Sequence, residues 1–321
     1  MQWGKGLWLG MVFFSAGATA QGYPTHPIKV IVPVPAGGYY DMVARTLGPK
    51  MSERLSQPFV VENRVGAGGL VGTAYAASST PDGYTLLVNG TGGLAIFPSL
   101  YPKLPYETLR DFAPIILTSG VPEILVVNPS LPAHSISELV TLARSRPGEL
   151  AYASNGSGTT MHLATEMFAI ASGTKFIHVP YNGGAPAMTS VLGGQTQILF
   201  GSATDVIQQV RAGKLRPLAV ASEKRIKILP DVPTLVESGF SGIVAEIWGG
   251  MLAPKGTPRE IVLRLNAEAN RVLEMPDVRE RMAPGGLGDI KGGTPEQFEQ
   301  FLRSEIAMWA KVVKSSGAKP D

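Results

Sequence analysis

The sequence predicts an α/β protein built of two lobes, each with a mostly parallel sheet flanked by helices. Short apolar runs that end in Gly- or Pro-containing turns alternate with amphipathic segments, which is the pattern of βαβ units. A second series of such units begins near Glu123. The length of 321 residues also suits two domains of ordinary size.

The first lobe opens with a β-α-β-α-β series. Residues 28–34 form a short apolar run that predicts a buried parallel strand, and the turn 35–38 follows it. Strands are also predicted over 59–63 and 84–88, and a helix over 71–77. The helix that follows the first turn has an apolar stripe at helical spacing, made of Met42, Val43, Leu47, Met51 and Leu55.

The second series repeats this alternation, and the chain then returns to the first lobe. Its expected strands cover 124–127, 150–153, 176–179, 198–200 and 215–221, and its helices 135–146, 161–171 and 185–192. A strand over 250–253 and helices over about 258–274 and 295–315 close the chain. We therefore expect one lobe from residues 21–122 plus 245–321, and a second from residues 123–244.

The composition excludes several classes of protein. Hydrophobic residues make up 44% of the chain and charged residues 17%, so a substantial core is available and a disordered chain is excluded. The net charge is only +3, and the basic residues form no dense run. A solvated surface explains them better than nucleic-acid binding.

Residues 1–20 have the pattern of a secretory signal peptide. Lys5 supplies the positive end, 7–14 is apolar but too short to span a bilayer, and Ala18-Thr19-Ala20 is an A-x-A cleavage site. An N-terminal membrane anchor is the alternative. The chain has no cysteine, which excludes disulfides, a lipid-bearing cysteine and thiolate chemistry. We expect a periplasmic protein that starts at Gln21.

Three polar loops are candidates for ligand binding. The loops 35–41, 89–93 and 154–160 follow strands, contain Gly, Ser, Thr or Asn, and include few charges. Ligands of open parallel sheets bind at this edge, and N–H groups at a helix start favour anions. Ordinary βα turns have a similar composition, so this alternative stays open. One helix N-terminus contributes about 0.3–2 kcal/mol. Micromolar binding needs roughly 8 kcal/mol, so both lobes must close on the ligand.

The chain resembles the Bug family, the periplasmic receptors of tripartite tricarboxylate transporters. The resemblance implies a type II Venus-flytrap fold and small carboxylate ligands, some of them aromatic acids or dicarboxylates. It also implies membrane permease subunits as partners. The motifs that carry it span the chain in order: Tyr23-Pro24, 32–38 (VPVPAGG), 61–69 (VENRVGAGG), 81–86 (PDGYTL), 152–154 (YAS), 178–181 (HVPY), 229–234 (LPDVPT) and 252–254 (LAP).

In that family the turn that matches 36–41 and the loop that matches 154–160 hold opposite carboxylates, partly through ordered water. Tyr181 resembles a tyrosine that faces the cleft. Asp41 is a candidate ligand contact as well, although a helix-capping role explains it equally well. The resemblance assigns the remaining ligand contacts to Ala36, Gly37, Gly38, Ser154, Gly158, Thr159 and Thr160.

The sequence departs from the family at two places. Tyr39-Tyr40 stands where the family has Gly and a small hydroxyl residue, and we expect one ring, that of Tyr40, to enter the cleft and favour an aromatic or flat acid over citrate. Gly201-Ser202 stands where the family often has Asp-Asn, with Asp205 further on as a candidate contact. The missing acid argues against an amino-acid ligand.

Other functions have weaker support. The sequence lacks G-x-S-x-G, H-E-x-x-H, Walker A and metal-spaced His/Cys sets, so we expect no catalysis, cofactor or metal. His178 is expected in the core, whereas His162 has a smaller claim to function, and Trp248 suits interlobe packing or a cleft wall. A sensor that presents bound ligand to a signalling partner is the alternative to uptake. We expect a monomer that binds no nucleic acid.

Overall fold

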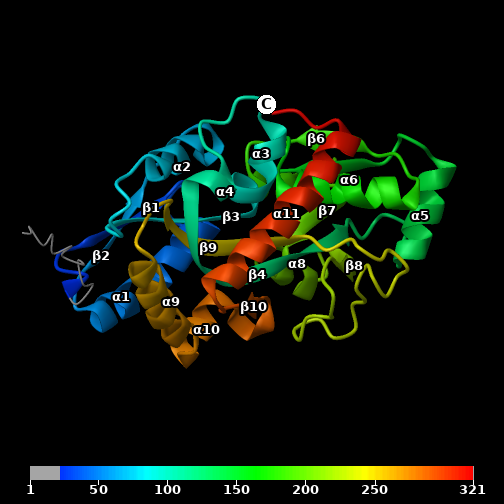
Figure 1. Cartoon of the computed structure of the whole chain (residues 1–321). Helices are drawn as coiled ribbons and strands as arrows, with labels where there is room; N and C mark the ends of the chain where they lie inside the picture. The colour runs from blue at the N-terminus through cyan, green and yellow to red at the C-terminus, as the bar shows by residue number, and fades with distance from the viewer. Residues whose placement is uncertain (1–21, 321) are drawn as a thin grey trace, which may run out of the picture.

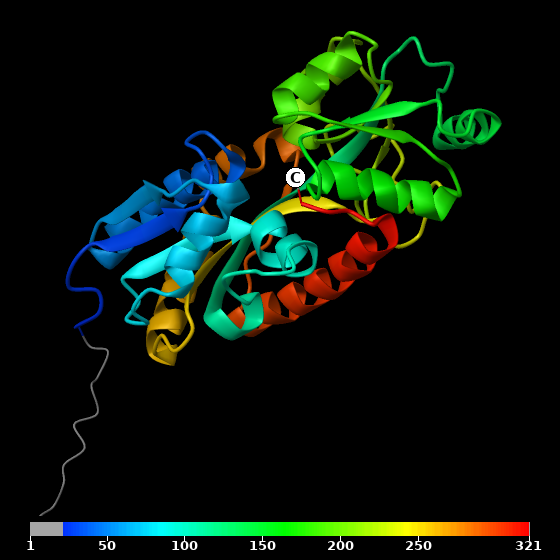
Figure 2. The ribbon, with the colours of Figure 1, turned by 90° about the horizontal axis from the view of Figure 1, so that it is seen from above.

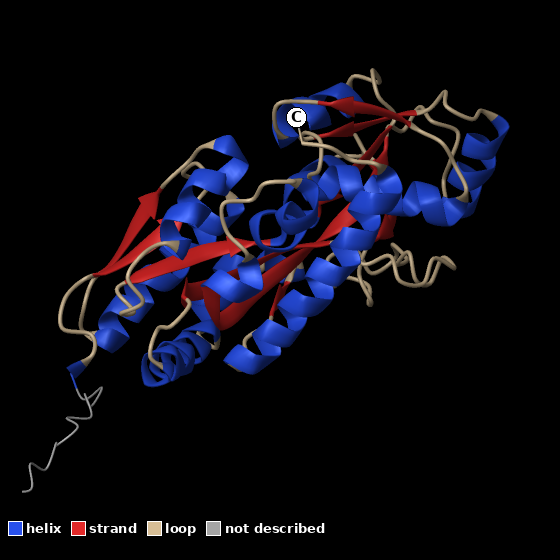
Figure 3. Cartoon of the chain, turned by 45° about the horizontal axis from the view of Figure 1, so that its top comes forward, coloured by secondary structure: helices blue, strands red, loops and turns tan. Residues whose placement is uncertain are grey.

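The computed structural model describes residues 22–320, which form two lobes that share one sheet. The predicted signal peptide lies outside the described residues. The strand order is β2-β1-β3-β9-β4-β7-β5-β6, and β8 and β10 pair with β4 outside this path. Figure 3 shows the strands as a band that passes from one lobe into the other. The predicted α/β class with two lobes is confirmed.

The first lobe has the expected parallel start. β1 (Ile28–Val32) lies between β2 (Phe59–Asn63) and β3 (Thr85–Gly90), and both neighbours are parallel to it. The connections are α1 (Tyr39–Leu55) and α2 (Leu70–Ala77). Most of the apolar stripe predicted for the first helix is buried, because that face of α1 packs on the sheet: Val43, Leu47, Met51 and Leu55.

The two lobes are joined by a pair of antiparallel strands that sequence patterns did not reveal at full length. β4 (Phe112–Val127) pairs with β9 (Glu246–Pro254) up to Pro122. Beyond that point, Glu123 to Val127 pair with the second lobe's strands instead. β4 therefore belongs to both lobes, and the predicted strand 124–127 is only its end. Figure 2 shows these strands crossing between the lobes.

The second lobe also combines parallel strands with an antiparallel contribution from β4. β5 (Ala151–Ser154) is parallel to β6 (Ile177–Pro180) and to β7 (Ile198–Ser202). β4 pairs antiparallel to β7 and to β8 (Arg216–Val220). The helices of this lobe are α5 (Ile136–Ser145), α6 (Thr160–Ser172), α7 (Gly184–Leu192) and α8 (Ala203–Arg211).

The C-terminal segment returns to the first lobe and ends at the second. α11 (Pro295–Ser316) packs on β4 and reaches α6 (Figure 1). Trp309 of this helix is fully buried. Within residues 22–320, none of the helices combines the length and apolar character needed to span a membrane. The remaining elements are η2 (Ala67–Gly69), η3 (Thr91–Ile96), α3 (Phe97–Leu100), α4 (Thr108–Asp111), α9 (Arg259–Leu273), α10 (Pro276–Met282), η4 (Pro284–Gly286) and β10 (Asp289–Ile290).

Candidate ligand-binding cleft

A cavity of about 610 Å³ lies where the two lobes meet, which is an ordinary size for a small-molecule site. Elements of both lobes form its walls: the turns before α1 and α2, the segment 92–101, the loop before α6, and the strands β4 and β9. Its lining residues are Val34, Gly38, Tyr39, Tyr40, Ala67, Gly68, Leu70, Gly92, Phe97, Tyr101, Glu123, Asn155, Gly156, Ser157, Gly158, Thr159, Thr160, Met161 and Ile247.

Among the helices that begin at the wall of this cavity, α1 and α6 come from opposite lobes. Tyr39 and Tyr40 open α1, Thr160 and Met161 open α6, and all of them line the cavity. The first N–H groups of a helix have no acceptor within the helix, and the helix dipole adds partial positive charge there. Opposite walls therefore both favour a negatively charged group of a ligand.

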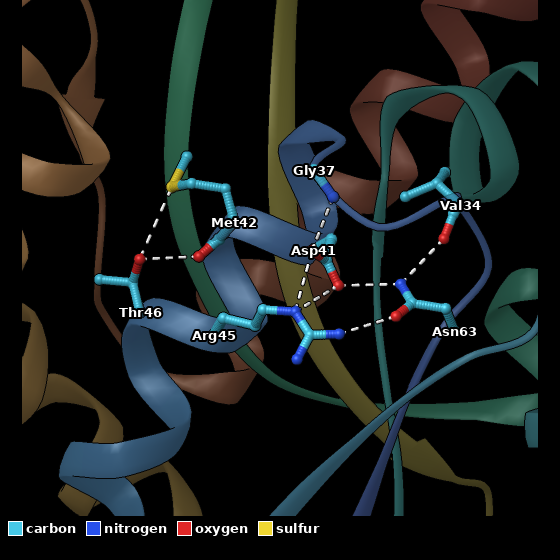
Figure 4. A network of polar contacts seen from close by, with 7 residues as sticks. All are labelled: Val34, Gly37, Asp41, Met42, Arg45, Thr46 and Asn63. Carbon is cyan, nitrogen blue, oxygen red and sulfur yellow. Dashed lines mark hydrogen bonds and ion pairs between the residues drawn. The ribbon is translucent and has the colours of Figure 1, made fainter.

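The turn before α1 is held by the Asp41 carboxylate (Figure 4). It accepts hydrogen bonds from the Gly37 N–H at 2.9 Å, the Asn63 amide at 2.8 Å and the Arg45 guanidinium at 2.9 Å. Burial raises the pKa of the Asp41 carboxyl, but these three donors outweigh burial and keep the pKa below its usual value. Asp41 is buried and is absent from the cavity wall, so its carboxylate fixes the turn from behind.

The loop before α6 is held by a comparable set of internal contacts. The Ser154 hydroxyl lies 2.7 Å from His178 Nε2, and Thr159 caps α6 by accepting from the N–H of His162. The Gly158 N–H donates to His162 Nδ1 at 2.9 Å, so this ring nitrogen carries no proton. The two imidazole rings stack with centroids 4.0 Å apart. The histidines thus support the loop from inside the lobe.

Tyr39 and Tyr40 both enter the cavity wall, although we expected only one of them to do so. Their rings meet edge to face with centroids 5.6 Å apart, and the Tyr39 hydroxyl lies 2.8 Å from Ser119 Oγ. Burial raises the pKa of both phenols, which are therefore neutral at neutral pH. Tyr40 packs over Gly90, where a Cβ would overlap the Trp248 carbonyl oxygen, so only glycine fits there.

Of the residues between 22 and 320 that line the cavity, Glu123 is the only one with a carboxyl group. It is fully buried, and neither side-chain oxygen has a hydrogen-bond partner. Its backbone groups are satisfied, because the N–H donates to Ala245 and the carbonyl accepts from Ala221. Burial, and then the negative charge of Asp205, raise the pKa of the Glu123 carboxyl well above its usual value. Asn155 Oδ1, in the same wall, is also buried without a partner.

Comparison with known proteins identifies the family. Residues 43–318 match the model of the tripartite tricarboxylate transporter family receptor. The chain belongs to this receptor family. It is also 39% identical to Protein BugT of Bordetella pertussis (strain Tohama I), over 98% of this chain and 96% of BugT.

Solved structures agree with this membership. The receptor is similar to an R. palustris protein solved with adipate, with a TM-score of 0.81 and 35% identity over 93% of this chain and 100% of that one. It is also similar to the periplasmic binding protein BugD, with a TM-score of 0.77 and 36% identity over 93% of this chain and 100% of that one. The resemblance seen in the sequence is confirmed.

The structure divides the predicted site residues of this receptor into two groups. Gly38, Tyr40, Gly158, Thr159 and Thr160 line the cavity. The other predicted site residues do not line the cavity, and several of them form hydrogen bonds within the protein. The Gly37 N–H is bound to Asp41, Ser154 Oγ contacts His178, and the Tyr181 hydroxyl donates to Ser190. Ala36 and Asp205 are exposed.

Glu123, Asn155 and the aromatic wall of Phe97 and Tyr101 were not among the predicted site residues. The sequence places Glu123 at the start of an apolar strand, where its direction depends on the register of β4. Trp248 is fully buried against α11, which belongs to the same lobe, and is absent from the cavity wall, so these contacts pack the first lobe and match neither of its two expected roles. No group of three or more potential metal ligands occurs among residues 22–320.

A second cavity, of about 640 Å³, lies on the other side of the strands that join the lobes of the receptor. Pro122 and Glu246 line this second cavity, whereas Glu123 and Ile247 line the first. The alternation follows from the pleat of a strand, which sends successive side chains to opposite faces. It explains why Glu123 faces the cleft between the two helix starts.

Proposed function

We propose that this receptor captures a small carboxylate between its lobes and delivers it to the membrane subunits of a tripartite uptake system. The observation that carries the proposal is the position of the cavity: the starts of α1 and α6 meet there from opposite lobes, beside strands common to both. The R. palustris relative solved with adipate supports a linear dicarboxylate as one ligand type.

In this proposal, one lobe of the receptor consists of residues 21–122 and 245–321, and the other consists of residues 123–244. The pairing of β4 changes partners between Pro122 and Glu123, which supports a hinge at that point. Ligand binding is expected to close the lobes and reduce the radius of gyration in solution scattering. An unchanged profile at saturating ligand would count against closure.

A receptor without catalysis suits the site better than an enzyme. The pair that most resembles a nucleophile and its base is Ser154 and His178, with 2.7 Å between the Ser154 hydroxyl and His178 Nε2. Ser154 is fully buried, also contacts Gly156, and does not line the cavity, so no substrate reaches its hydroxyl. We also propose that the protein is an exported periplasmic monomer, cleaved after Ala20, and that it binds no nucleic acid.

The test is a thermal-shift and calorimetric screen of the mature chain against aliphatic and aromatic carboxylates. The protein is first unfolded and refolded so that ligand retained from the cell is removed. A ligand at 100 times its Kd adds about 2.7 kcal/mol to the free energy of unfolding. For a chain of this size, that raises Tm by about 5 °C. Failure of every carboxylate to bind would refute the proposal.

A further inference from the structure

Among the described residues, the cavity wall has unmet hydrogen-bond acceptors and no cationic side chain. Both oxygens of the fully buried Glu123 and the Oδ1 of Asn155 lack partners. An amide oxygen accepts hydrogen bonds and donates none, and the Glu123 carboxyl becomes an acceptor only when a neighbouring cation favours its ionised form. Buried polar atoms without a partner are rare in folded proteins, so each one needs an explanation. A ligand that brings N–H donors into the cavity provides it.

The other lining residues are compatible with a cation at this place. Among the described residues that line the cavity there is no Lys, Arg or His, and Glu123 is the only acid. Aromatic rings from Tyr39, Tyr40, Phe97 and Tyr101 form much of the first lobe's wall. Aromatic faces attract cations when water is excluded. The cavity therefore combines two helix starts that favour an anion with an acidic and aromatic part that favours a cation.

We infer that the ligand carries a protonated amino group in addition to its carboxylate, and that Glu123 and Asn155 receive this group. The inference rests on the proposed function, because it names the second polar group of the same ligand. The carboxylate lies at the start of α1 or α6, and the ammonium donates to the Glu123 carboxylate and to Asn155 Oδ1. The ligand class is that of amino acids, including amino dicarboxylates.

A plain dicarboxylate fits this wall less well. It brings no N–H donor, so Asn155 Oδ1 stays unmet, and it places negative charge in the cavity with Glu123. It binds beside Glu123 only when Glu123 is protonated and donates its own O–H. That alternative predicts the opposite response to Glu123→Gln, because the glutamine amide still donates to a carboxylate but cannot neutralise an ammonium.

The experiment compares acids that differ only in the amino group: succinate with aspartate, adipate with 2-aminoadipate, and 3-phenylpropionate with phenylalanine. Calorimetry on the mature refolded protein gives the affinity of each member. In the best-binding pair the amino member is expected to bind at least about tenfold more tightly. Glu123→Gln should weaken its binding about thirtyfold or more while changing its plain partner little.

Two further variants keep the test interpretable. Glu123→Asp retains the charge and should keep part of the preference for the amino member. The control is Glu246→Gln, which removes a nearby carboxyl group on β9. Glu246 lines the second cavity and pairs with Lys291, so its loss should leave the preference unchanged. Each variant is used only if its unfolding transition stays cooperative.

The outcomes separate the inference from the proposed function. Tighter binding of the plain acids, or an unchanged affinity of Glu123→Gln for the amino member, would overturn the inference and leave the carboxylate receptor standing. A second result would also overturn the inference: the wild type prefers the plain acids, and Glu123→Gln still binds them. Glu123 would then act as a neutral hydrogen-bond donor. If no member of any pair binds, the proposed function fails as well.

Discussion

Glu123 is expected to destabilise the ligand-free receptor, and replacing it should reveal by how much. Glu123→Met keeps the length of the side chain and removes two buried oxygens that have no partner. An unsatisfied buried polar group costs about 1–3 kcal/mol, and more when it is charged. For a chain of this size, about 2 °C corresponds to 1 kcal/mol, so Tm should rise by about 2–6 °C.

The gain should also depend on pH. The pKa of Glu123 in the folded protein lies above the ordinary value of 4.5, first because of burial and then because of Asp205. Between the two pKa values the folded state binds more protons than the unfolded state, so the stability of the wild type falls as pH rises through that window. Glu123→Met removes this loss. The advantage of the variant should therefore grow from pH 4.5 upwards and then level off.

Glu305 provides a matched control with the opposite expectation. Its carboxylate is also largely buried, but it accepts from the indole N–H of Trp248 at 2.6 Å and of Trp309 at 3.1 Å. Glu305→Met leaves both donors unmet and should lower stability by about 2–4 kcal/mol. Urea unfolding of ligand-free protein at pH 5 and pH 8 measures both variants. A loss of stability in Glu123→Met at both pH values would refute the reasoning.

Three further changes test the rest of the cleft. Asp41→Asn should destabilise by about 1–2 kcal/mol at neutral pH, because hydrogen bonds to charged groups are the stronger ones. The wild-type advantage should disappear as pH falls through the lowered pKa of Asp41, measured by acid unfolding. Gly158→Ala should weaken ligand binding about tenfold, since its Cβ would overlap Leu100 at a φ of +71, whereas Gly92→Ala, in open space in the lining of the same cavity, should not. Tyr40→Ser should weaken an aromatic acid more than a short aliphatic diacid, and equal losses in calorimetry would mean that the ring makes no such distinction.

Much of the scaffold could be predicted because its signals are local. The apolar stripe of α1, the helix α5 and the parallel strands each depend on residues close in sequence. β4 could not be predicted at full length, because its partners are distant: β9, β7 and β8 decide where it starts and which face each side chain takes. The loops 35–41 and 154–160, which precede α1 and α6, could also be predicted from local sequence. Their internal bonding could not, because Asp41 and His162 take up N–H groups that the motif alone leaves free for a ligand.

The register of β4 also changes the argument about the ligand. The sequence has Gly201-Ser202 where the family often has an acid, which argues against an amino-acid ligand. In the sheet, Gly201, at the family's Asp position, pairs with Ile124, whereas Ser202, at the Asn position, pairs with Glu123. A carboxyl group therefore lies beside the Asn position and not at the Asp position, is supplied by β4 instead of β7, and belongs to a residue that lines the cavity. Because strand pairing places residues 79 positions apart next to each other, a missing acid in one motif does not mean a missing charge in the site. The objection to an amino group on the ligand thus loses its basis.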